Sequence, residues 1–179
     1  MIKMKSKLVV VLELVVQAGS IVVASAAPSE QQRTMDKVQK ELVTLPYYSV
    51  FDNLEYKVDG DTVTLSGQVR NPVTRRDAEG RVARIEGVDH VINKIEVLPV
   101  SGFDDSIRAR AYRAVFRSGN LYRYAMGANP SVHIVVKNGH VTLEGLVSSQ
   151  MDSQLAYMAA RGVPGVFSVT NNLRVGGRS

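Results

Sequence analysis

The apolar positions of this chain first recur every three or four residues, as on one face of a helix. The members of this first stretch are Met35, Val38, Leu42 and Leu45. Pro46 follows directly, and proline is not tolerated inside a helix because it lacks the backbone N–H. The pattern therefore predicts a helix that ends before Pro46.

Alternating apolar and polar positions come next and predict a β-hairpin. Its inward-facing positions are Tyr56, Val58, Val63, Leu65 and Val69, and the turn is predicted at Asp59-Gly60-Asp61. A second helical stripe follows Pro72 and carries Ala78, Val82 and Ile85. Val91, Ile95 and Val97 then alternate as a third strand. The order of elements is α-β-β-α-β.

The chain repeats itself at an offset of 78 positions without a gap. The matching segments include Val63-Thr64-Leu65 with Val141-Thr142-Leu143, and Gly87-Val88 with Gly165-Val166. In the second copy, Asp104-Asp105 is expected to cap the first helix and Gly119 to end it. Asn138-Gly139 predicts a two-residue turn that places His133 opposite Glu144 and His140 opposite Lys137.

These elements predict an α+β fold of two tandem α-β-β-α-β units. Each unit is expected to form a three-stranded mixed sheet covered by two helices on one face. We place the units at 34–98 and 104–175, with a linker at 99–103 and a tail at 176–179. One such unit is small for an independent core, so packing two together would add stability.

The repeated motifs resemble the BON domain, a module named after bacterial osmotically inducible and nodulation-related proteins. The residues that carry the resemblance are Val58 to Gly67 and Gly87 to Asn93 in the first unit, and Val136 to Gly145 and Gly165 to Asn171 in the second. The resemblance implies an envelope location, no enzymatic activity, no cofactor, and binding to phospholipid membranes. It provides no catalytic residues to transfer.

The N-terminal segment is typical of a secretory signal peptide. Lys3, Lys5 and Lys7 precede an apolar stretch, and Ala24-Ser25-Ala26 supplies a small-x-small cleavage pattern. We therefore expect residues 1–26 to be removed on export to the periplasm, leaving a flexible N-terminus at 27–33. The alternative is an uncleaved inner-membrane anchor, since the apolar stretch is about 20 residues long.

Composition narrows the chemistry that the chain can perform. It has 45% hydrophobic and 22% charged residues, no Cys and three His. The lack of Cys excludes disulfides, thiolate metal sites and a thiol nucleophile. We predict no catalytic site, no metal site and no nucleic-acid binding, while the oligomeric state is not determined by the sequence.

Positive charge is concentrated in the second half. Residues 28–98 carry 10 Lys/Arg and 12 Asp/Glu, whereas residues 99–179 carry 9 and 4. On the first helix of the second unit, Arg110, Arg113 and Arg117 fall on one stripe beside Tyr112 and Phe116. Such a face could hold anionic phospholipid, with arginines on phosphates and aromatic rings at the interface.

Two other interpretations of this stripe stay open. The arginines could be a solvated helix face, with the two aromatic rings buried between the units. The aromatic surface could also bind an envelope protein, or support its folding, as a periplasmic interaction module.

Overall fold

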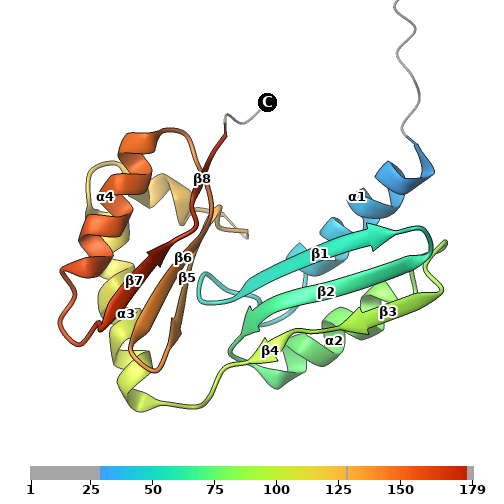
Figure 1. The fold of residues 1–179 in the computed structure, drawn as a ribbon, viewed down its shortest axis with the longest axis horizontal. Coiled ribbons are helices and arrows are strands. Elements are labelled where there is room, and N and C mark those ends of the chain that lie inside the picture. Colours follow the sequence, from blue (N-terminus) through green and yellow to red (C-terminus); the bar gives the residue numbers. More distant parts are fainter. Residues whose placement is uncertain (1–28, 128, 177–179) are drawn as a thin grey trace, which may run out of the picture.

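Two copies of one small α+β unit lie side by side in the computed structural model, which describes residues 29–127 and 129–176 (Figure 1). The expected signal peptide and the last residues of the expected tail lie outside these residues. The elements of the first unit are α1 (Glu30–Val43), β1 (Asn53–Asp59), β2 (Thr62–Val69), α2 (Pro72–Val82), β3 (His90–Asn93) and β4 (Glu96–Val97). The elements of the second unit are α3 (Gly102–Arg117), a 3-10 turn (Leu121–Tyr124), β5 (Val132–Lys137), β6 (His140–Val147), α4 (Gln150–Arg161), β7 (Ser168–Asn171) and β8 (Arg174–Val175).

Each sheet is mixed, as the sequence predicts. In the first unit, β2 pairs antiparallel with β1 and parallel with β3 and β4. In the second unit, β6 pairs antiparallel with β5 and parallel with β7 and β8. The alternating valines of each hairpin lie in the core beneath the two helices, so each unit has its own hydrophobic core. The α+β fold of two repeated units is confirmed.

The repeat extends to individual hydrogen bonds. The Asn93 side chain donates to the Arg75 carbonyl and accepts from the backbone N–H of Ile95. Seventy-eight positions later, Asn171 does the same with the Ser153 carbonyl and the Leu173 N–H. Each asparagine thereby joins the second helix of its unit to the break in the third strand.

The register of the second hairpin is also as predicted. Lys137 pairs with His140, and His133 pairs with Glu144. Asn138 and Gly139 both have positive φ, which is the conformation that favours an Asn-Gly turn. In the first unit the turn is shorter than predicted, because Asp59 already pairs with Thr62 and leaves only Gly60 and Asp61 between the strands.

Three boundaries differ from the prediction. Helix α1 begins at Glu30, inside the segment expected to be flexible, because the Ser29 side chain caps it. Helix α3 begins at Gly102 and is capped by Ser101, so Asp104 and Asp105 lie in its first turn and are not its caps. The single third strand of each unit is interrupted, which divides it into two short strands.

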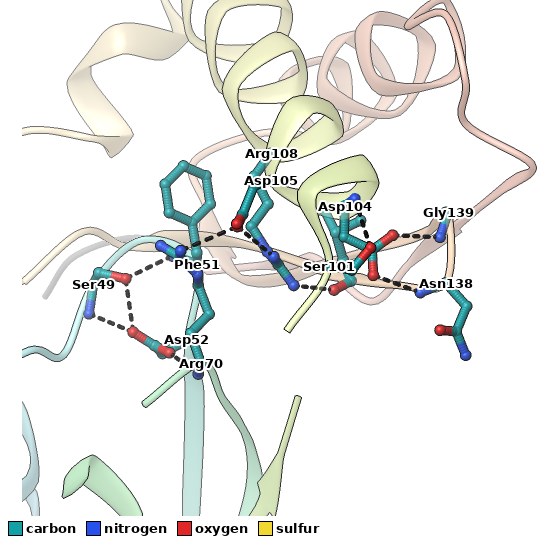
Figure 2. Close-up of polar contacts among 11 residues, drawn as sticks. Ser49, Phe51, Asp52, Arg70, Ser101, Asp104, Asp105, Arg108, Asn138 and Gly139 are labelled. Carbon is teal, nitrogen blue, oxygen red and sulfur yellow. Dashed lines mark hydrogen bonds and ion pairs between the residues drawn. The ribbon is translucent and has the colours of Figure 1, made fainter. Parts of the chain in front are cut away.

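The segment between α1 and β1 joins the first unit to the second. The Val50 carbonyl accepts a hydrogen bond of 2.7 Å from the Ile134 N–H, at the free edge of β5. Val50 and Phe51 pack against the core of the second unit. Arg70 reaches from the end of β2 to Asp105 on α3, at 3.1 Å, with its guanidinium 5.7 Å from the Phe51 ring (Figure 2). Backbone, apolar and ionic contacts together hold the two units against each other.

Candidate interaction face on the second unit

The three predicted arginines lie on the outer side of α3, but not equally exposed. Arg113 and Arg117 are exposed. Arg110 is half-buried, with a guanidinium nitrogen close to Gly165 in the loop after α4. Within the described residues, no carboxylate lies within ion-pair distance of any of the three. Their charge is therefore not neutralised locally.

The two predicted aromatic residues are not on this surface in the way the sequence suggested. Phe116 is 5% exposed and belongs to the core of the second unit. Tyr112, 38% exposed, lies between Phe116 and Phe51, with ring centroids 5.0 Å and 6.1 Å away. The expectation of an exposed ring is wrong for Phe116, because this ring packs in the core of the second unit. Tyr112 keeps an exposed part, and its ring contacts Phe51 of the first unit.

Other apolar side chains are exposed near the arginines of α3. Phe103 in the first turn of α3 and Phe167 in the loop before β7 are 48% and 69% exposed, with ring centroids 5.8 Å apart. Met151 and Met158 on α4 are 65% and 69% exposed. The position of Phe103 could have been predicted from the sequence. It lies seven positions before Arg110 and therefore on the same stripe of the helix. Phe167 could not be found that way, because a loop brings it to Phe103.

We call this surface the α3–α4 face and define it by its exposed apolar residues and its arginines. They are Phe103, Arg110, Arg113, Arg117, Met151, Met158, Arg161 and Phe167. The two helices pack on each other, and Gly119 at the end of α3 lies against Leu155 of α4. Figure 1 shows both helices on one side of the second sheet, with α4 on the far side from the first unit.

The equivalent helices of the first unit have a different surface. Apart from Pro72, the exposed residues of α1 and α2 are charged or carry side-chain amides, and both signs of charge are interspersed. On α3 and α4 the one exposed carboxylate is Asp105, which is already paired with Arg70 and Arg108. Two units with the same fold therefore differ in the chemistry of their helical layer.

Three buried acidic residues, Asp52, Asp104 and Asp152, have structural partners. Asp52 accepts from the Ser49 and Arg70 backbone N–H groups, and Asp104 from those of Asn138 and Gly139 (Figure 2). A hydrogen bond from Tyr124, with further bonds from Ser149 and Arg123, holds the pKa of Asp152 below its usual range.

A buried histidine lies at the contact between the units. Its Nδ1 is 3.3 Å from the Ser49 carbonyl and its Nε2 is 3.5 Å from the Tyr48 hydroxyl. Burial lowers the pKa of this residue, His133, and raises the pKa of Tyr48 to about 12. His133 therefore acts as a neutral hydrogen-bonding group in this contact. In the part of the chain that the structure describes, no cluster of three or more His, Asp or Glu could hold a metal ion.

Residues 31–99 and 104–177 each match the family model described as the BON domain. A similar protein is Osmotically-inducible protein Y of Escherichia coli (strain K12), which is 31% identical over 130 residues. That alignment covers 68% of this chain and 61% of the relative, so the chain spans less than two thirds of the relative's length. The tandem resemblance inferred from the repeated motifs is confirmed.

Two solved structures of CdsD, a structural protein of the type III secretion system of Chlamydia trachomatis, also match. One, a C-terminal domain, has a TM-score of 0.33 at 11% identity and covers 83% of this chain and 100% of its own. The other has a TM-score of 0.31 at 10% identity and covers 80% and 93%. At such scores the likeness carries no argument. None of the helices within residues 29–127 and 129–176 combines the length and the hydrophobicity of a membrane-spanning segment.

Proposed function

We propose that this chain, which belongs to the BON domain family, binds anionic phospholipid surfaces peripherally in the bacterial periplasm through its α3–α4 face. In this role it would act without catalysis and support envelope integrity under osmotic or related stress. The observation that carries the proposal is the contrast between the two helical layers. The same fold presents unpaired arginines and exposed apolar side chains in the second unit, and mixed charges in the first.

The chemistry of the α3–α4 face fits a lipid headgroup region. Arginine forms bidentate hydrogen bonds with phosphate, and apolar side chains can enter the boundary between headgroups and acyl chains. Each basic residue near an anionic surface contributes about 1 kcal/mol, so three contribute roughly 3 kcal/mol. Phe103 and Phe167 would each add about 1 kcal/mol as half of their surface leaves water. This sum supports reversible binding and not permanent anchoring.

Co-sedimentation with vesicles tests the proposal. We expect the protein to bind vesicles that contain phosphatidylglycerol and not vesicles of phosphatidylcholine alone. Replacing Arg110, Arg113 and Arg117 by Glu should lower the affinity by about a hundredfold or more, from the three lost contacts.

A matched variant separates a specific face from general electrostatics. Arg75, Arg76 and Arg84 are exposed on or just after α2, and their replacement by Glu changes the net charge by the same amount. This variant should keep most of the affinity. Equal binding to both kinds of vesicle, or an equal loss in both triple variants, would contradict the proposal. Cell fractionation with N-terminal sequencing of the protein tests the periplasmic location.

A further inference from the structure

Each unit has a groove between its first helix and the outer edge of its first strand, and residues 29–127 and 129–176 fill only one of the two grooves. In the second unit the groove lies between α3 and β5 and holds the segment Ser49–Phe51 of the first unit. Val50 bonds to the edge of β5 through the Ile134 N–H, and the Phe51 ring packs near Tyr112 of α3. The chain thus shows that this type of groove can bind an extended backbone segment.

The groove of the first unit has the same construction. The Val136 carbonyl, on the edge of β5, accepts a hydrogen bond from Arg108 of α3. The Val58 carbonyl, 78 positions earlier on β1, accepts one from Gln31 of α1. Helix α1 therefore stands against the edge of β1 as α3 stands against the edge of β5.

The edge of β1 offers the same backbone donor. Outward-facing groups alternate along an edge strand, and the Val58 carbonyl faces outward. The Tyr56 N–H, two residues before it, then faces outward too, at the position equivalent to Ile134. Within the described residues it has no acceptor, whereas the Ile134 N–H bonds to Val50.

The groove of the first unit opens into a cavity between the two units. Its volume is about 1160 Å³, and it is lined along α1 and β1 by Gln39, Leu42, Val43 and residues 53–56. Two carboxylates, Glu55 on β1 and Glu144 on β6, and one guanidinium, Arg174, are its charged groups. Each carboxylate is held by an asparagine amide, from Asn53 and Asn172 respectively.

The chain's own repeat does not supply the occupant of this groove. The segment equivalent to Ser49–Phe51 would be residues 127–129, which read Gly-Ala-Asn and carry no large apolar side chain. Residues 127–129 therefore offer no counterpart of Val50 and Phe51, in this chain or in a second copy of it. The excess of negative charge in the cavity favours a basic segment of a partner polypeptide as the occupant.

We propose that the groove between α1 and β1 binds an extended segment of a partner polypeptide by strand addition. The segment would pair its backbone with the Tyr56 N–H and place an apolar side chain against Leu42 and Leu54. A basic side chain beside it would reach Glu55 or Glu144, because the cavity has an excess of negative charge. Strand addition obtains affinity from main-chain hydrogen bonds and specificity from the side-chain pockets.

The test uses the full chain and two synthetic peptides that differ only in charge. They are the capped pentapeptides Lys-Val-Phe-Val-Lys and Glu-Val-Phe-Val-Glu. Amide exchange followed by NMR should show that the lysine peptide slows exchange at Tyr56. The Ile134 amide, already bonded to Val50, is the internal reference and should not change.

Two charge-reversal variants complete the test. Glu144→Lys should weaken binding of the lysine peptide by about fivefold or more, since it replaces an attraction by a repulsion. Glu86→Lys makes the same change on an exposed side chain outside the cavity and should leave binding unchanged. Unchanged exchange at Tyr56, protection on the α3–α4 face in its place, or equal binding of both peptides would overturn the proposal.

Discussion

The buried carboxylate of Asp104 is expected to hold the second hairpin turn against α3. Its two oxygens accept from the Asn138 and Gly139 backbone N–H groups, each at 2.8 Å. Both turn residues have positive φ, so this turn depends on a conformation that few residues adopt readily. The variant Asp104→Asn keeps the size of the side chain but turns an amide group toward one of these donors.

The expected loss follows from these two contacts. A hydrogen bond to a charged group contributes about 1.5–3 kcal/mol, and an unsatisfied buried donor costs a similar amount. The Asp104→Asn side chain would keep one neutral bond and lose the other, so the free energy of unfolding should fall by about 2–4 kcal/mol. Asp104 lies in the first turn of α3, where a negative charge interacts favourably with the helix dipole. Removing this charge should therefore add about 0.5 kcal/mol to the loss.

Urea unfolding followed by circular dichroism measures this loss, and amide exchange locates it. Exchange at Asn138 and Gly139 should accelerate in Asp104→Asn. The neighbouring variant Asp105→Asn is the control, because Asp105 bonds to Arg70 and Arg108 and not to the turn. A change below about 0.5 kcal/mol, or equal acceleration in both variants, would refute the role given to Asp104.

Two further predictions concern the buried histidine at the contact between the units and a glycine near the end of β6. Burial lowers the pKa of His133 below that of the unfolded chain, so its stabilising contribution is complete above about pH 6.5 and is lost as the pH falls through the lower, folded value. The free energy of unfolding should therefore decrease between pH 7 and pH 5. This decrease should be smaller in His133→Gln, whereas the control His90→Gln should show the same decrease as the unmodified protein. Gly145 has φ +116°, and a Cβ there would lie 2.1 Å from the Ser131 carbonyl oxygen, so Gly145→Ala should destabilise the protein by about 2 kcal/mol or more. Gly80→Ala, in the open middle of α2, should instead stabilise it by about 0.5–1 kcal/mol in thermal unfolding, and a reversed order would contradict this account.

Local patterns predicted most of the fold. The spacing of Val38 and Leu42 defines the buried face of α1, and the Asn138-Gly139 pair defines the register of the second hairpin. These features depend on residues close together in the chain. The repeat then allowed each element found in one unit to be checked in the other.

The candidate site was predicted less well, because it depends on contacts between distant residues. Helical spacing placed Arg113 and Arg117 correctly on an exposed stripe, but it could not show that Phe51 of the first unit packs beside Tyr112. Nor could it show that a loop brings Phe167 to Phe103. The docking of Val50 on β5 involves residues 84 positions apart, and the sequence around them shows no pattern for it.

The membrane role of the α3–α4 face can be measured with a single fluorescent residue. The chain contains no Trp, so Phe167→Trp reports only on this face, and Tyr47→Trp, on an exposed residue of the first unit, is its matched control. On addition of vesicles that contain phosphatidylglycerol, we predict a blue shift and quenching by brominated acyl chains for Phe167→Trp and neither for Tyr47→Trp. An unshifted Phe167→Trp spectrum in the presence of bound vesicles, or an equal response from both variants, would contradict the central claim.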